Sequence, residues 1–391
     1  MTTISDLYRP RQKDAVSARD LSSQQNVRAR GMKEAGEASI QVPFAGITAG
    51  GVLTPGLFPV EATGLPTAPI RDAALAWLAS LDDAQRAAAT FAVDDSNWRL
   101  WSNVHMYLLR HGVSMEYMSE VQKERTFDIL RAALSPFGFE TSRNIMRLND
   151  TVRELTQRDI EFGEFPYWMS IFGDPSGSEP WGWQFDGHHL IINCLVAGDQ
   201  IVMTPMFMGS EPTVAPSGKY AGTSVFGPED QNGLVFVQSL DASQKSKAVL
   251  GTEIPEEVFG CAYRDNMEMN YEGLRLDSLT AGQKDLASAM LRTYTHRMRE
   301  DHADLWLNRI EKYLDQTYFA WMGGTGPDDV FYYRVHSPVV LIEFDHLKGI
   351  ALENDVPTRE HIHTIVRTPN GNDYGFDLLR QHREQYDHSR A

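Results

Sequence analysis

The chain alternates between blocks of helical and strand-like pattern, and this alternation constrains its fold more than any single motif does. From "PIRDAALAWLASL" to about residue 155, apolar residues recur every three or four positions, which predicts helices. Between about 165 and 265 the chain holds β-rich runs split by Gly, Pro, Asp and Asn, namely "YWMSIFG", "HHLIINCLV", "QIVMTPMF" and "GLVFVQSL". A second helical block and a second set of strand-like runs follow.

The predicted order is therefore helices, strands, helices, strands, without a strict βαβ alternation or a fixed-period repeat. We assign a helical layer to 68–155, strands to 165–265, helices to 275–321, strands to 329–368 and a C-terminal helix to 374–388. This order predicts an α+β fold in which central and C-terminal strands join in one mostly antiparallel sheet flanked by helical layers. Residues 1–40 are predicted to form a polar N-terminal arm and 41–391 a single domain; two domains with a break near 160 or 270 are the alternative.

Three local signals refine this assignment. Asp82 and Asp83 are placed to cap the helix in "DDAQRAAATF", and Ser119 is placed to cap "SEVQKERTFDILRAAL". The run "HHLIINCLV-AGD-QIVMTPMF" predicts a hairpin around residues 197–199. The segment "NWRLWSNVHMYLLRHG" is assigned to the helical layer, with His105 as a core residue and Gly112 at the helix end.

Charge and composition exclude several classes of function. The 53 acidic and 36 basic residues give a formal net charge of −17, which repels nucleic acid and anionic membrane surfaces. The chain contains neither a run of eighteen apolar residues nor an N-terminal apolar h-region, so we expect a cytoplasmic protein with no membrane partner. Cys194 and Cys261 lack the paired spacing of a zinc knuckle or redox motif and are predicted to be packed thiols.

The stretch "HIHTIVRTPNGNDYG" carries the first candidate site residues. Strand alternation places His361, His363 and Arg367 on one face and the apolar Ile362 and Val366 on the other. Two histidines at i and i+2 point the same way and can bind one metal ion, while the arginine can hold an anionic substrate group. The alternative is a half-exposed strand that shows its histidines to water.

The preceding strands place polar residues where burial favours aliphatic ones. In "VVLIEFDH", Glu343 is costly to bury unless it is paired, hydrogen-bonded or bound to a metal ion. In "FYYRVH", Tyr332, Arg334 and His336 share one strand face. The alternative is that Glu343 faces outward from a one-sided sheet.

The stretch "WGWQFDGHHLIINCLV" adds a third group of candidates. Read as a strand, it places His189 and Asn193 on a polar face, and His188 with the apolar residues toward a core. Upstream of these histidines, polar residues alternate with indole rings, as they do in the walls of a ligand pocket: Trp181, Trp183, Gln184 and Asp186. The alternative is that the tryptophans and histidines cap the end of the sheet as satisfied core residues, and for His188 this is the preferred interpretation.

Four segments, in order, resemble the hallmark segments of the bacterial and fungal domain of unknown function 3500 family. They are "WSNVHMYLLRHGV", "FGDPSGSEPWGWQFDGHHL", "VFYYRVHSPVVLIEFDH" and "HIHTIVRTPNGNDYGFDLLRQH", and the resemblance extends over nearly the whole chain from about residue 45. The family pattern has a polar residue where this chain has Ile191, which makes the polar face around His189 and Asn193 smaller here. The resemblance supports the unity of the chain, but it implies no reaction, so function is inferred from residue chemistry.

Together these residues predict a metal-dependent enzyme that acts on a small-molecule substrate. The predicted ligands of a single divalent ion, with zinc favoured over iron or manganese, are His189, Glu343, His361 and His363. A metal-activated water would attack a substrate carbonyl, giving a hydrolase. The other predicted catalytic groups are Arg367 or Arg334 as the anion-binding residue and Asp186 or Asp373 as the base. The predicted pocket is lined by Trp181, Trp183, Gln184, Asn193 and Tyr332.

Two alternatives to the hydrolase remain at this stage. Two histidines and one glutamate also match the ligand set of non-haem iron oxygenases. In a metal-free binding or structural protein, the histidines would instead form a polar network that orients the sheet. The common hydrolase, redox and dinucleotide-binding motifs are absent from the sequence. Their absence favours none of the three hypotheses.

Overall fold

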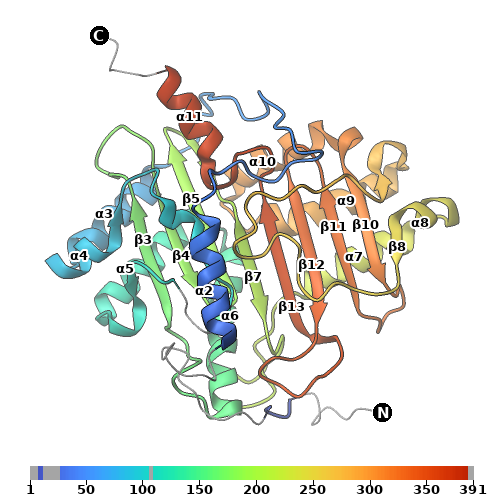
Figure 1. The fold of residues 1–391 in the computed structure, drawn as a ribbon, viewed down its shortest axis with the longest axis horizontal. Helices are drawn as coiled ribbons and strands as arrows, with labels where there is room; N and C mark the ends of the chain where they lie inside the picture. The colour runs from blue at the N-terminus through green and yellow to red at the C-terminus, as the bar shows by residue number, and fades with distance from the viewer. Residues whose placement is uncertain (1–7, 12–26, 105–108, 386–391) are drawn as a thin grey trace.

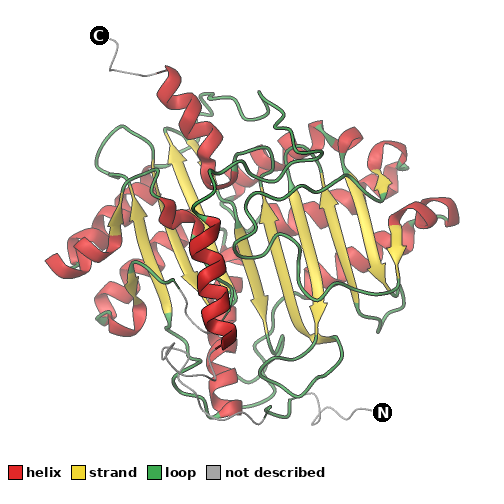
Figure 2. Ribbon diagram, in the orientation of Figure 1, coloured by secondary structure: helices red, strands yellow, loops and turns green. Residues whose placement is uncertain are grey.

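A computed structural model describes residues 8–11, 27–104 and 109–385. Its central feature is one 13-stranded sheet that contains both the central and the C-terminal strands (Figures 1 and 2). The α+β fold with a mostly antiparallel sheet is therefore confirmed. Among the described residues, no helix is long and apolar enough to cross a membrane.

The sheet runs in the order β1-β3-β4-β5-β7-β13-β12-β11-β10-β8, and the short strands β2, β6 and β9 pair with β3, β5 and β10, respectively. Among the described strand pairs of this sheet, β1–β3 and β8–β10 are parallel and the others are antiparallel. The strands are β1 Thr90–Phe91, β2 Val113–Ser114, β3 Tyr167–Phe172, β4 Trp181–Gly187, β5 Leu190–Ala197, β6 Gln200–Val202, β7 Met206–Ser210, β8 Val249–Gly251, β9 Leu274–Arg275, β10 Tyr318–Gly323, β11 Phe331–His336, β12 Leu341–Leu347 and β13 Thr358–Arg367. The central and C-terminal strands meet where β7 pairs with β13.

The described α-helices are α2 Val27–Ser39, α3 Ala68–Ser80, α4 Asp83–Ala89, α5 Glu120–Ala133, α6 Pro136–Thr156, α7 Gly227–Ser239, α8 Ala242–Ala248, α9 Ala281–Thr295, α10 Glu300–Lys312 and α11 Phe376–Gln385. The predicted caps are present: Asp82 and Ser119 each form a capping box with a glutamine three residues later. The predicted hairpin is also present, since β5 and β6 pair on either side of Gly198 and Asp199.

The two faces of the sheet differ in chemistry because side chains alternate along each strand. Residues of α3, α5, α6, α7, α9 and α10 pack on one face, the apolar face, against alternate strand residues such as Phe185, Ile192, Met208 and Phe344. The opposite, polar face carries Gln184, Asp186, Asn193, Tyr332, Arg334, Glu343, Asp345, His361, His363 and Arg367. Figure 1 shows α2, α11 and long loop segments crossing in front of the sheet, with α7 and α9 behind it. The polar face is therefore covered, and its charged side chains are buried.

Several predicted element boundaries are wrong. "GLVFVQSL" is part of helix α7, which begins with Pro228 in its first turn and buries Gly233, Phe236 and Val237 at helical spacing. An alanine Cβ at Gly233 would lie 2.3 Å from the Tyr333 ring, so a glycine lets this helix approach β11. Helix α8 also falls within the region predicted as strands.

Other boundaries shift at the ends of the predicted blocks. "YFAW", assigned to the second helical block, is the start of β10 because β11 and β8 supply backbone partners on both sides. In "NWRLWSNVHMYLLRHG" the described residues contain a short 3-10 helix, Ser96–Arg99, rather than a long α-helix, and His105 lies outside the described residues. Of the predicted N-terminal arm, residues 27–39 form helix α2, and the C-terminal helix is described to Gln385.

Candidate metal centre

The two adjacent histidines, predicted as strand residues, form the turn of the β4–β5 hairpin. Gly187 pairs with Leu190, so only His188 and His189 connect the strands. His189 has a φ of 61°, in the left-handed region that a tight turn requires. His188 is buried, with its Nδ1 2.7 Å from Asn149 Oδ1. The strand prediction failed here because histidine is not a typical turn residue.

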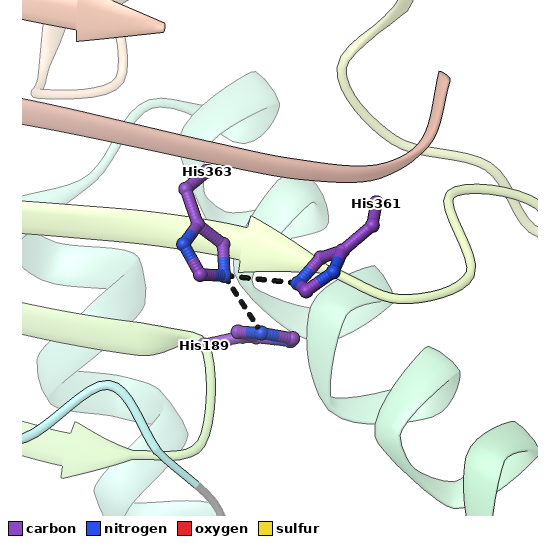
Figure 3. A group of neighbouring side chains, drawn as sticks. All are labelled: His189, His361 and His363. Atoms are coloured by element: carbon purple, nitrogen blue, oxygen red, sulfur yellow. Dashed lines mark hydrogen bonds between the residues drawn. The ribbon is translucent and has the colours of Figure 1, made fainter. Parts of the chain in front are cut away.

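The structure brings His189, from the β4–β5 turn, together with His361 and His363, which both lie on β13 (Figure 3). The Nε2 atom of His363 lies 3.0 Å from Nε2 of His189 and 3.1 Å from Nε2 of His361. All three side chains are buried, with exposed fractions of 5%, 2% and 5% for His189, His361 and His363. A tetrahedral zinc ion with Zn–N bonds of 2.0–2.1 Å requires N···N separations of about 3.3 Å, close to those observed. The arrangement therefore fits three nitrogen ligands of one small cation.

The outer nitrogens of two rings are held by groups that determine which ring nitrogen carries the proton. His361 Nδ1 lies 2.8 Å from the carbonyl oxygen of Lys348, which can only accept a hydrogen bond. His363 Nδ1 lies 2.7 Å from Glu257 Oε1, which accepts when the carboxylate is ionised. Each ring then donates from Nδ1, and its Nε2 carries a lone pair. The two lone pairs converge, and a cation bound between them would remove their repulsion.

Burial sets the charge state of His363, the central ring of the cluster. Desolvation, with the neighbouring His361 as a smaller cause, holds the pKa of His363 well below its ordinary value, so this ring is neutral at pH 7. Metal ligation requires this neutral form. Desolvation raises the pKa of Glu257 to about 7, while backbone and side-chain donors, including Asn103, act in the opposite direction. Glu257 is therefore poised to exchange a proton near neutral pH.

Gly209 on β7 makes room for the cluster. Its backbone N–H donates to the carbonyl oxygen of His189 (2.8 Å), and it stands directly opposite His363 in the β7–β13 pair. An added Cβ would lie 2.7 Å from His363 Cδ2 and 3.2 Å from His189 Cδ2. The His189 and His363 rings can thus contact each other because position 209 has no side chain.

Gly209→Ala is expected to separate the two rings and weaken metal binding at least about tenfold, since the new methyl group would occupy ring space. Zinc affinity measured by competition with a chromophoric chelator checks this. Gly251→Ala is the matched control, because its added Cβ meets no atom within 4 Å. Equal affinities of the two variants would contradict the role assigned to Gly209.

Glu343, predicted as a ligand, is not part of the histidine cluster among the described residues. Its carboxylate accepts from the backbone N–H groups of Phe259 (2.9 Å) and Gly260 (2.7 Å) and from the Tyr332 hydroxyl (2.6 Å). Glu343 lies opposite Ile365 in the sheet, two positions away from His363. Both Glu343 and Tyr332 therefore anchor the loop at 259–260 instead of facing a metal ion or substrate.

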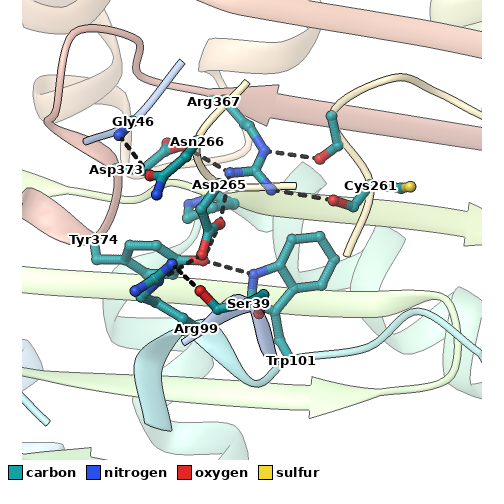
Figure 4. Close-up of polar contacts among 12 residues, drawn as sticks. Ser39, Gly46, Arg99, Trp101, Cys261, Asp265, Asn266, Arg367, Asp373 and Tyr374 are labelled. Atoms are coloured by element: carbon teal, nitrogen blue, oxygen red, sulfur yellow. Dashed lines mark hydrogen bonds and ion pairs between the residues drawn. The ribbon is translucent and has the colours of Figure 1, made fainter. Parts of the chain in front are cut away.

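Arg367 and Asp373, predicted as catalytic, form a buried ion network with Asp265 (Figure 4). Arg367 Nη1 donates to Asp265 Oδ1 (3.1 Å) and Asp373 Oδ2 (3.0 Å), and its other nitrogens donate to the carbonyls of Gly260 and Cys261. Asp373 also accepts from the Thr368 N–H. Since the donors of Arg367 are occupied and its side chain has no exposed surface, the network is structural.

Arg334 and Asp186 are likewise engaged in ion pairs. Arg334 Nη2 donates to Glu272 Oε2 (2.8 Å), and its side chain is almost fully buried. Asp186 is paired with Arg110, and both side chains are 4% exposed. Neither arrangement presents these residues to a substrate at the histidine cluster.

The predicted pocket walls lie elsewhere in the fold. Trp181 and Trp183 belong to the core on the apolar face, opposite the histidines. Gln184 and Asn193 do share the polar face, where Gln184 Nε2 donates to Asn193 Oδ1 (2.6 Å) and to the Trp98 carbonyl (2.9 Å). Asn193 Nδ2 donates to the Pro205 carbonyl (2.7 Å). Both amides hold loop segments to the sheet.

Sequence reasoning missed three residues around the cluster: Gly209, Glu257 and Asp345. Glu257 lies in the loop "TEIPEEVFG", which has no strand pattern to place it. Asp345 could have been found, because it follows Glu343 by two positions and so shares its face.

The fold and the cluster define an α+β protein with three buried histidines on the polar face of its sheet. The family described as "Protein of unknown function (DUF3500)" matches residues 63–376, which is most of the chain, so the chain belongs to this family. No curated protein and no solved structure matches the chain.

Proposed function

We propose that this protein is a metal-dependent hydrolase that uses a divalent ion, zinc in the first place, to activate water against a carbonyl group of a small molecule. His189, His361 and His363 would bind the ion through their Nε2 atoms. The convergence of these atoms, 3.0 and 3.1 Å apart around His363, carries the proposal. Three protein ligands leave one tetrahedral position for water or substrate, as in catalytic zinc sites.

The residues around the ligands support a catalytic centre. A bound zinc ion would lower the pKa of its water to about 7. The Glu257 carboxylate and the Lys348 carbonyl hold the outer nitrogens of His363 and His361, the outer contact that orients metal-bound imidazoles. Glu257, with its pKa near 7, can also take a proton in the reaction.

The ligand set favours the hydrolase over an iron oxygenase. The facial triad of those enzymes requires a carboxylate ligand, and Glu343 is held by Tyr332 and two backbone N–H groups. The net charge of −17 supports a small molecule over nucleic acid as substrate. A cytoplasmic location is part of the same proposal.

Elemental analysis of protein purified without a histidine tag tests the metal centre. We expect about one zinc ion per chain, because three converging imidazole nitrogens form a strong zinc site. A metal content below about 0.2 per chain after reconstitution would contradict the proposal and favour a metal-free histidine network.

The reaction is tested with an activated ester such as p-nitrophenyl acetate. Zinc-loaded protein should hydrolyse it faster than protein treated with a chelator, and added zinc should restore the rate. Equal rates of ester hydrolysis with and without bound metal would overturn the hydrolase assignment. Oxygen consumption by the iron-loaded protein would also overturn it.

A further inference from the structure

Asp345 on β12 is a buried acid with no hydrogen-bond partner among the described residues. It has no exposed surface, and neither carboxylate oxygen contacts a donor. Leaving a buried carboxyl unpaired costs free energy, and such groups persist at functional sites. Burial of Asp345 therefore costs free energy of folding, and no hydrogen bond from the described residues offsets this cost.

Asp345 is next to the histidine cluster. It stands directly opposite His363 in the antiparallel β12–β13 pair, so both side chains leave the same face of the sheet. The Cβ atoms of such pairs are about 5 Å apart. Asp345 is not within the group whose ligand atoms lie within 4.8 Å of one another, so the geometry makes it a neighbour of the metal centre and not a ligand.

The ionisable groups that act on Asp345 are acids. Desolvation, with Glu257 and Glu343 as further causes, raises the pKa of Asp345 well above its ordinary value. The two arginines of the polar face, Arg367 and Arg334, are bound to their own carboxylates. A carboxylate-bearing substrate would thus meet acids beside Asp345, and the two arginines on the described strands of this face are already bound to carboxylates.

We propose that Asp345 is a substrate-binding residue that receives a cationic nitrogen group, an ammonium or a guanidinium, placed beside the metal centre. This inference names the substrate class of the proposed hydrolase, and it rests on the proposed function for the identity of the group that reacts at the metal ion. The cation supplies the donors that both oxygens of Asp345 lack, and it offsets the negative charge of the neighbouring acids. A cationic substrate group is the opposite of the expectation from sequence, in which an arginine binds an anionic group of the substrate.

Binding of small probes to zinc-loaded protein tests this inference. Methylguanidinium and ethylammonium are compared with acetate by titration calorimetry at constant ionic strength. Wild type should bind the two cations and not acetate, and Asp345→Asn should weaken cation binding by about tenfold or more, as expected for loss of a hydrogen bond to a charged group. Asp355→Asn removes the same charge from a side chain that is 85% exposed and should leave binding unchanged.

Equal cation affinity in wild type and Asp345→Asn, or preferential binding of acetate, would overturn the inference. Metal content measured on the same samples separates it from the proposed function. Protein that holds zinc but binds no cation refutes the role of Asp345 alone. Protein that holds no zinc but loses cation binding in Asp345→Asn refutes the metal centre and leaves the cation site in place.

Discussion

His363→Ala is expected to reduce zinc affinity by more than about 100-fold and to abolish zinc-dependent hydrolysis. His363 is the central member of the cluster, since its Nε2 contacts the Nε2 atoms of both other histidines. Glu257→Gln keeps all three ligands and replaces the charged outer acceptor of His363 with a neutral amide oxygen, for which we expect a loss of affinity of about tenfold. Zinc affinity measured by competition with a chelator should therefore decrease from wild type to Glu257→Gln and further to His363→Ala.

His336→Ala is the matched control for this series. His336 is also a buried histidine, on β11, but it is not part of the cluster. Its variant should retain about one zinc ion per chain. Elemental analysis gives the metal content of each variant, and circular dichroism on the same samples shows whether it is folded. If a folded His363→Ala variant keeps its full metal content, the ligand assignment is wrong.

Arg367→Ala is expected to destabilise the fold by about 3–5 kcal/mol, the typical cost of removing one partner from a buried ion network. The substitution leaves Asp265 and Asp373 without their shared guanidinium, and it removes the donors to the Gly260 and Cys261 carbonyls. Asp265 keeps Arg99 and Tyr374 as partners, whereas Asp373 keeps the Thr368 N–H as its one remaining donor among the described residues. The free energy of unfolding from urea titration measures the effect.

The surface variant Arg380→Ala provides the comparison. Arg380 pairs with Asp377 and Glu384, but its side chain is 56% exposed, so the loss should be below about 1 kcal/mol. A loss of similar size in both variants would contradict a structural role for the Arg367 network. A stable Arg367→Ala with impaired catalysis would restore the substrate-binding role expected from sequence.

The parts of the fold that depend on local pattern could be predicted. The alternation in "HIHTIVR" placed His361 and His363 on one face of a buried strand, where they lie. The caps at Asp82 and Ser119 and the hairpin at 198–199 follow from side chains that hydrogen-bond or turn within a few residues. Helix α7 and strand β10 could not be assigned, because α7 packs against α9 and β11, and β10 takes its backbone partners from β11 and β8.

The candidate site shows the same division. The sequence by itself determined that histidines and acids share one face of a sheet, since a period of two requires it. Only the tertiary structure decided their partners, because these come from segments more than 100 residues away: Asp265 binds Arg367, Glu257 reaches His363, and Gly209 lets His189 meet His363. Strand alternation specifies the face on which a side chain lies, whereas loop packing and strand order specify what meets it there.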